Sequence, residues 1–323
     1  MSDRRTLVLG SLAAVLAATM YGVNAPLSVM AYGHGVTPIG FTLWRAAFSV
    51  LSLIVLLALV RVGGRGLRLH ALDRRSAMLL AAAGLSGALL NLCIFSAFGR
   101  ISVALALITF YTYPAMVALT SVLFHGERLT APKVGSLALA IAGMGLVVVG
   151  QADLAEGLRI DLVGLALAFA AALFQVAYFT IGHSGFRDLP ADEATLGVFA
   201  ISIPVYVVAG VVTGGLAAAV STPIGDPALL GIAAIAGIAG AAIPSILLLT
   251  GIRTIGGVRT GILLLLEPVV GVALAAIVLG QTIVPLQVVG GVLVLAGGVL
   301  LQAVPERDGG TVLVTEDEPA PTV

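Results

Sequence analysis

The sequence predicts an all-α membrane protein in which ten transmembrane helices form two inverted five-helix repeats. Three observations support this fold class: an apolar composition, uninterrupted apolar runs of helical length, and an internal repeat at a constant shift of 154 residues. Of the 323 residues, 59% are hydrophobic and 10% are charged, which lies far outside the usual range of soluble domains. The runs are about 20 residues long and lack two-residue alternation, so we expect helices rather than a membrane barrel.

The predicted spans follow the apolar runs along the chain. They cover Leu7 to Ala31, Ile39 to Val60, Ala77 to Phe98, Val103 to Phe124, Val134 to Val149, Leu162 to Ile181, Ala194 to Val212, Ala228 to Ile252, Val258 to Leu279 and Val284 to Ala303. Arg4 and Arg5 before the first run resemble the start of a secretory signal. We favour a membrane span, because the run is longer than a signal core and cleavage would break the repeat.

The repeat predicts how the spans are organised. At the 154-residue shift Gly10 falls on Gly164 and Pro114 on Pro268, with no gap between the copies. Each copy holds five spans, and because five is odd the second copy enters the membrane from the opposite side. We expect a first repeat over residues 1–154, a second over 155–304, and a disordered cytoplasmic tail over 305–323.

The basic residues predict the orientation of the chain. With the N-terminus inside, thirteen of the sixteen Lys and Arg residues lie in cytoplasmic segments. Arg100 and Arg159 lie on the opposite side, and Arg45 falls within a span. Because cytoplasmic loops of membrane proteins are enriched in Lys and Arg, we expect both termini in the cytoplasm.

Two charged residues, Arg45 and Glu267, lie well within the predicted spans. A charge at the centre of a bilayer is costly, so each should face a partner or a wet cavity. For Arg45 two interpretations stay open: a structural anchor that bonds helix carbonyls, or a group that holds a substrate carboxylate. Glu267 lies near mid-depth, where a carboxylate can bind substrate or exchange a proton, and the spacing permits a salt bridge to Arg45 without requiring one.

A proline follows the matched positions Tyr113 and Glu267 in both halves. Pro114 and Pro268 remove a backbone donor, so the carbonyls of Phe110 and Leu264 lose their helical partners. We therefore expect both helices to kink near mid-depth and to form part of a cavity wall.

Polar and aromatic side chains also recur at matched positions or on one helix face. Tyr21 and Asn24 fall over Gln175 and Tyr178 at the shift of 154 residues. Any one of these residues can be an interhelical contact, but together they favour a shared central cavity. The predicted substrate-binding residues are Tyr21, Asn24, Arg45, Asn91, Phe95, Thr109, Tyr113, Gln175, Tyr178 and Glu267.

The motifs of other functional classes are absent from the sequence. It contains no P-loop, no Gly-x-Ser-x-Gly elbow and no His-Glu-x-x-His metal pair. We therefore expect neither an enzyme nor an ATP-driven pump, with no cofactor and no metal. The expected partners are a small-molecule substrate, membrane lipid and, as one option, protons, with no nucleic acid; the oligomeric state stays open.

Several segments resemble the EamA family of the drug/metabolite transporter (DMT) superfamily. They are the run TLWRAAFSVLSLIVLL, the segment YPAMVALTSVLFHGERLTAPKVGSLALAIAGMGLVVVG and its counterpart EPVVGVALAAIVLGQTIVPLQVVGGVLVLAGGVL. Gly126-Glu127-Arg128 matches the Gly-Glu that closes the family's fourth helix, whereas the second half has Gly280-Gln281. For Glu127 we prefer a helix-end role to a gating role.

The resemblance implies a secondary transporter, often an exporter of amino acids or related metabolites, with a cavity reached alternately from each side. We expect such an exporter in a bacterial inner membrane, with amino acids as the first substrate class. The alternatives are an exporter of amphipathic drugs and a non-transporting membrane protein for lipid handling or assembly. We expect specificity where the repeat is broken, at Tyr113 against Glu267, Phe199 against Arg45, and Glu127 against Gln281.

Overall fold

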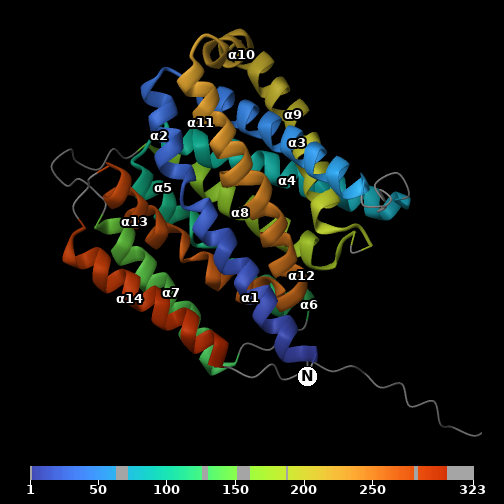
Figure 1. The fold of residues 1–323 in the computed structure, drawn as a ribbon. Coiled ribbons are helices and arrows are strands. Elements are labelled where there is room, and N and C mark those ends of the chain that lie inside the picture. Colours follow the sequence, from blue (N-terminus) through green and yellow to red (C-terminus); the bar gives the residue numbers. More distant parts are fainter. Residues whose placement is uncertain are drawn as a thin grey trace, which may run out of the picture.

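The computed structural model describes residues 2–62, 72–125, 130–150, 161–186, 188–279 and 283–303. These residues form a bundle of helices without a strand (Figure 1). The helices are α1 (Ser2–Tyr21), α2 (Asn24–Gly33), α3 (Pro38–Val62), α4 (Arg74–Phe98), α5 (Val103–Phe110), α6 (Tyr113–His125), α7 (Ala131–Val149), α8 (Leu162–Ser184), α9 (Ala191–Val212), α10 (Leu216–Ile224), α11 (Pro227–Gly237), the π-helix η2 (Ile238–Ala242), α12 (Ile243–Leu264), α13 (Glu267–Leu279) and α14 (Pro285–Ala303). The predicted repeat boundary, the predicted tail and the residues 126–129 and 280–282 lie outside the described part of the chain.

Eight helical stretches among the described residues are long and apolar enough to cross a membrane, and a shorter apolar helix covers Pro285–Leu301. This count differs from the ten predicted spans mainly at Pro227–Leu264, which forms one stretch of 38 residues. Within it the backbone kinks at Gly256, where φ is 81° and ψ is 163°. A residue with a Cβ rarely adopts that conformation, so glycine permits the turn between the predicted eighth and ninth spans.

Short polar side chains fix where several helices begin. Asp73 accepts hydrogen bonds from the amides of Arg75 and Ser76 at the start of α4. Asp161 accepts one from Val163 at the start of α8, at 2.8 Å, and Asp226 caps α11 in the same way. Such caps satisfy amides that have no partner within the helix, so they set the helix ends at the edges of the apolar runs.

Three of the predicted spans are interrupted near their middle. One break separates α1 from α2 at Gly22 and Val23, and a second separates α5 from α6 at residues 111 and 112. The third separates α12 from α13 at residues 265 and 266, which is 154 residues further along the chain than the second. The second and third breaks lie directly before the helices that carry Pro114 and Pro268, where a missing amide donor was expected to weaken the helix.

The largest helix interfaces join the two halves of the chain. α1 packs against α12, and α4 packs against α8, which is the same contact with the halves exchanged. The pair α7 and α14 forms one edge of the bundle (Figure 1) and approaches closely. A Cβ added to Gly143 of α7 would lie 2.6 Å from the carbonyl oxygen of Gly290 in α14, so glycine is required at this crossing.

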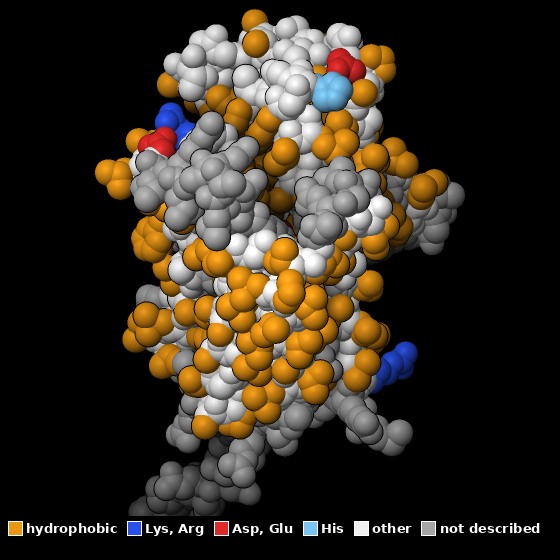
Figure 2. Space-filling view, turned by 90° about the vertical axis from the view of Figure 1, so that its left-hand side faces the viewer, with side chains coloured by type: hydrophobic (Ala, Val, Ile, Leu, Met, Phe, Trp, Pro, Cys, Tyr) orange, Lys and Arg blue, Asp and Glu red, His pale blue; other side chains and the backbone are white. Residues whose placement is uncertain are grey.

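The outer surface of the bundle is apolar. In Figure 2, hydrophobic side chains cover most of the lower part of the face shown and are scattered over the upper part, and charged side chains appear at only a few places near its margins. Many large apolar side chains are more than half exposed, including Leu59, Leu123, Val208 and Ile277. A soluble protein rarely exposes apolar patches of this extent, so lipid is the expected environment of this surface.

Candidate functional site

A cavity of about 900 Å³ lies inside the bundle. Nine of the ten predicted binding residues line it, and these are Tyr21, Asn24, Arg45, Asn91, Phe95, Tyr113, Gln175, Tyr178 and Glu267. Thr109 does not, because its hydroxyl points along its own helix and donates to the carbonyl of Leu105 at 2.9 Å. Of the two prolines, Pro268 lines the cavity and Pro114 does not.

Arg45 of α3 is nearly buried, with 4% of its surface exposed. Its Nη1 donates to Oδ1 of Asn91 in α4 at 2.8 Å, and its Nη2 donates to the carbonyl of Gly240 in η2 at 2.9 Å. The guanidinium also lies 5.4 Å from the centroid of the Phe95 ring. These contacts join three elements, and no direct ion pair connects Arg45 with Glu267 in the described structure.

The π-helical segment η2 supplies acceptors that the sequence did not predict. The carbonyl of Gly240 accepts from Nδ2 of Asn24 at 2.9 Å as well as from Arg45. One turn earlier, the carbonyl of Gly237 accepts from the Ser49 hydroxyl at 2.8 Å. Because a π-helix departs from the regular hydrogen-bond ladder, its carbonyls are available to side chains of α2 and α3.

Glu267 begins α13, directly after the break at residues 265 and 266, and it is partly exposed and lines the cavity. The phenols of Tyr21, Tyr111 and Tyr113 are close enough to interact with its carboxyl electrostatically. The buried hydroxyl of Tyr111, which has no well-formed hydrogen bond, faces this carboxyl. The backbone also packs closely here, since a Cβ added to Gly22 would lie 3.1 Å from the carbonyl oxygen of Glu267.

Several other residues of the wall were not among the predicted binding residues. Ser245 of α12 shares a hydrogen bond of 2.8 Å with the hydroxyl of Tyr21, and Phe110 and Tyr111 extend the aromatic surface at the α5 break. The position of Ser245 was available from the repeat, since it lies 154 residues after Asn91. Tyr111 carried no such signal, because its counterpart is Leu265, which does not line the cavity.

The cavity reaches one end of the bundle. α1 and α6 each contribute a single residue to its wall, Tyr21 and Tyr113, whereas α2, α5 and α13 contribute several. In Figure 1, α1 and α6 run toward the end that holds the N-terminus, and α2 lies away from it. A cluster of buried apolar side chains that includes Phe179, Leu249 and Ile252 fills the half next to α1 and α6.

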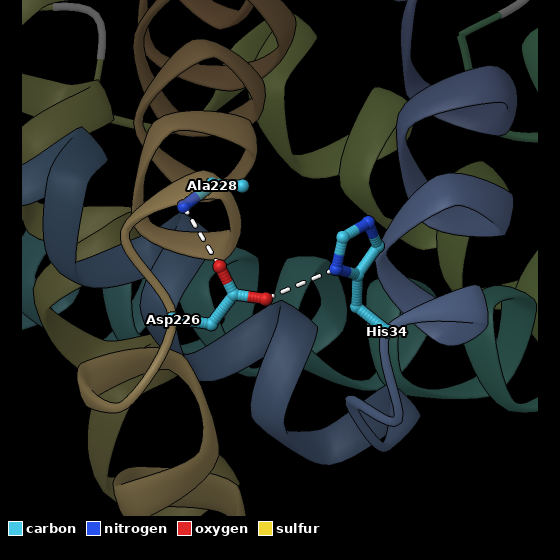
Figure 3. A network of polar contacts seen from close by, with 3 residues as sticks. All are labelled: His34, Asp226 and Ala228. Carbon is cyan, nitrogen blue, oxygen red and sulfur yellow. Dashed lines mark hydrogen bonds and ion pairs between the residues drawn. The ribbon is translucent and has the colours of Figure 1, made fainter.

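Polar pairs mark the end to which the cavity extends. Nδ1 of His34, just after α2, lies 3.0 Å from Oδ2 of Asp226, whose other oxygen accepts from the amide of Ala228 (Figure 3). The contact with His34, followed by the Ala228 amide, lowers the pKa of Asp226. Arg100 lies 3.1 Å from Asp161 in a similar pair. No group of His, Cys, Asp and Glu in the described residues has an arrangement that could hold a metal ion.

Comparisons with known proteins agree with this architecture. A family model described as the EamA-like transporter family matches residues 8–149 and 162–302, so that the two matches begin 154 residues apart. A solved structure titled "Crystal structure of protein" shares the fold, with a TM-score of 0.68 and 18% identity over 92% of this chain and 97% of that chain. No curated protein matches the chain. Because the family model covers most of the sequence, the chain belongs to the EamA-like transporter family.

Proposed function

We propose that this member of the family is a secondary transporter that exports small metabolites by alternating access. The observation that carries the proposal is a cavity of about 900 Å³ that holds Arg45 and Glu267 and extends to one end of the bundle. Its volume suits a small polar or amphipathic molecule. Amino acids are the first substrates to test.

The proposed arrangement in the membrane has ten spans in two inverted repeats, with both termini in the cytoplasm of a bacterial cell. Support comes from the distribution of Lys and Arg and from the equivalent interfaces that exchange the two halves. In this orientation the cavity extends to the outer side, and the buried cluster around Phe179 and Leu249 closes the inner side. Export would require the opposite state, in which the halves open inward.

Proton linkage is part of the proposal and rests on Glu267. Among the described residues that line the cavity, it is the only acidic one, and a carboxyl in a desolvated site can exchange a proton in the physiological range. Glu267→Gln keeps the shape and removes the charge. We therefore expect the variant to fold and to lose the pH dependence of transport.

The test uses purified protein in vesicles. Counterflow of labelled amino acids, nucleosides and amphipathic amines is measured at several pH values for the native chain, for Glu267→Gln and for Gly145→Ala. A Cβ added to Gly145 would meet no atom within 4 Å, and this glycine lies off the cavity, so its variant is the control. Transport by the native chain with unchanged pH dependence in Glu267→Gln contradicts the proton role, and no transport of any compound contradicts the transporter.

Of two alternatives, the first has a specific observation in its favour and the second has one against it. An exporter of amphipathic drugs would use the aromatic part of the wall, where Phe95, Phe98 and Phe110 lie. A protein for lipid handling or assembly would not need a polar cavity between the halves, so the cavity at Glu267 favours transport over this second alternative. The counterflow panel includes amphipathic amines in order to separate drug export from metabolite export.

A further inference from the structure

The two formal charges in the cavity wall differ in how accessible they are. Arg45 and Glu267 are the only charged residues among the described ones that line the cavity. Arg45 is 4% exposed, whereas the side chain of Glu267 is only partly buried. More of Glu267 than of Arg45 is therefore accessible to a ligand in the cavity.

The burial and the contacts of Arg45 limit how far a ligand in the cavity can reach its guanidinium. Both terminal nitrogens donate to protein acceptors, at 2.8 Å to Asn91 and at 2.9 Å to the carbonyl of Gly240. The Cζ atom of the group lies over the Phe95 ring, 5.4 Å from its centroid. These bonds use two of the five N–H donors of the guanidinium, and Nε is buried without a partner, so what keeps a ligand carboxylate from Arg45 is its burial, with 4% of its surface exposed.

The surroundings of Glu267 favour a cation. Tyr21 and Phe110 are partly exposed and line the same cavity, and Tyr21 is near enough to the carboxyl to interact with it electrostatically. The Phe110 ring packs 5.1 Å from the Tyr113 ring, which is itself a neighbour of Glu267. The faces of aromatic rings carry negative potential, so rings beside a carboxylate attract a protonated amine.

From this arrangement we infer that the preferred ligand is an organic amine with an apolar or aromatic body and without a free carboxylate. Its ammonium group pairs with Glu267 and lies against the Tyr21 and Phe110 rings, and its body occupies the aromatic part of the cavity. This inference rests on the proposed function and narrows the substrate class within it. An amino acid fits less well, because its carboxylate would lie beside Glu267 while Arg45 stays buried in the wall.

Compounds that differ by one charged group test the inference. The set for one ring system is tryptamine, tryptophan and N-acetyltryptophan, which carry the amine alone, both charges and the carboxylate alone; tyramine with tyrosine is a second set. Binding to the purified full chain is measured by calorimetry and by thermal stabilisation in detergent, since a ligand of the native state raises its apparent stability. We expect tryptamine to bind at least tenfold more tightly than tryptophan, and N-acetyltryptophan to bind most weakly.

Two variants and two control variants locate the group that the protein recognises. Glu267→Gln should weaken tryptamine binding about tenfold or more, because hydrogen bonds to charged groups are the stronger ones, and should change tryptophan binding much less. Phe110→Leu keeps an apolar side chain and should weaken tryptamine binding by a smaller factor. Phe169→Leu, at an exposed position off the cavity, is the matched control. Glu267→Asp, which retains the charge, should bind tryptamine better than Glu267→Gln. This comparison distinguishes loss of the charge from a structural effect of the substitution.

The outcomes separate this inference from the proposed function. If tryptophan binds as tightly as tryptamine, or if Glu267→Gln leaves tryptamine binding unchanged, the amine class is wrong while transport of metabolites can still hold. If vesicles with the native chain transport none of the compounds, the proposed function itself fails. If tryptamine leads the series and depends on Glu267, the inference is supported.

Discussion

Replacing Gly143 by alanine tests the close crossing of α7 and α14 that joins the two halves. A Cβ at this position would lie 2.6 Å from the carbonyl oxygen of Gly290 and 2.7 Å from the amide nitrogen of Val294. Ordinary contacts of a Cβ begin at 3.4 Å, so the helices must separate by about 0.8 Å, the difference between 3.4 and 2.6. Overpacking of a well-packed interface costs about 1–3 kcal/mol. We expect a loss of this size, because backbone atoms cannot move aside as a side chain does.

The matched control is Gly145→Ala on the same helix. A Cβ at Gly145 would meet no atom within 4 Å, and both variants gain the same helix propensity of alanine over glycine, about 1 kcal/mol. The difference between them therefore isolates the crossing. Thermal unfolding of the purified proteins in one detergent should place Gly143→Ala below Gly145→Ala by several degrees, the order expected for about 1–3 kcal/mol. Equal melting temperatures would show that the helices separate without cost and would refute the argument.

Three further predictions concern the cavity and its rim. Gly240→Ala places a Cβ 2.6 Å from Oδ1 of Asn24, so ligand binding should weaken at least severalfold, whereas Gly231→Ala, with no atom within 4 Å, should bind normally; titration calorimetry compares the two. Arg45→Ala should weaken binding of carboxylate and neutral ligands by similar factors, because its donors hold the wall; a loss confined to carboxylates would assign it to the ligand. Asp226→Asn should destabilise the chain at neutral pH. Because the His34 contact and the Ala228 amide lower the pKa of this carboxyl in the folded chain, the difference from the native chain should vanish as the pH falls through that lowered pKa, which melting curves at several pH values would show.

Much of this site could be predicted because the sequence repeats. Pro114 and Pro268 marked matched positions, and the breaks at residues 111–112 and 265–266 lie directly before their helices. A missing backbone donor weakens the helix locally, so its effect can be predicted from the sequence. Rare charges in apolar runs are readable for a similar reason, since burial of Arg45 and Glu267 demands a polar environment. Both residues indeed line one cavity.

Other features depend on tertiary contacts and had no sequence signal. The π-helix at Ile238–Ala242 lies in a run of small apolar residues, and nothing in that run distinguishes it from an α-helix. Its Gly240 carbonyl nevertheless decides how Arg45 and Asn24 are held. Thr109 shows the opposite case, a predicted residue whose side chain does not reach the cavity. Its polar side chain satisfies its own helix at the carbonyl of Leu105 and stays out of the wall.

Two of the three predicted specificity pairs, at which the two halves of the repeat differ, line the cavity. Tyr113 and Glu267 both line the cavity, and so do Phe199 and Arg45, whereas the third predicted mismatch, Glu127 against Gln281, lies outside the described residues. A repeat with identical side chains at these positions would give a cavity with equivalent walls and paired charges. Because each charge occurs in one half only, the described wall has a single carboxylate and a single guanidinium. The guanidinium donates hydrogen bonds to Asn91 and to the carbonyl of Gly240. The scaffold can thus remain symmetric while each half contributes a different charge to the cavity wall.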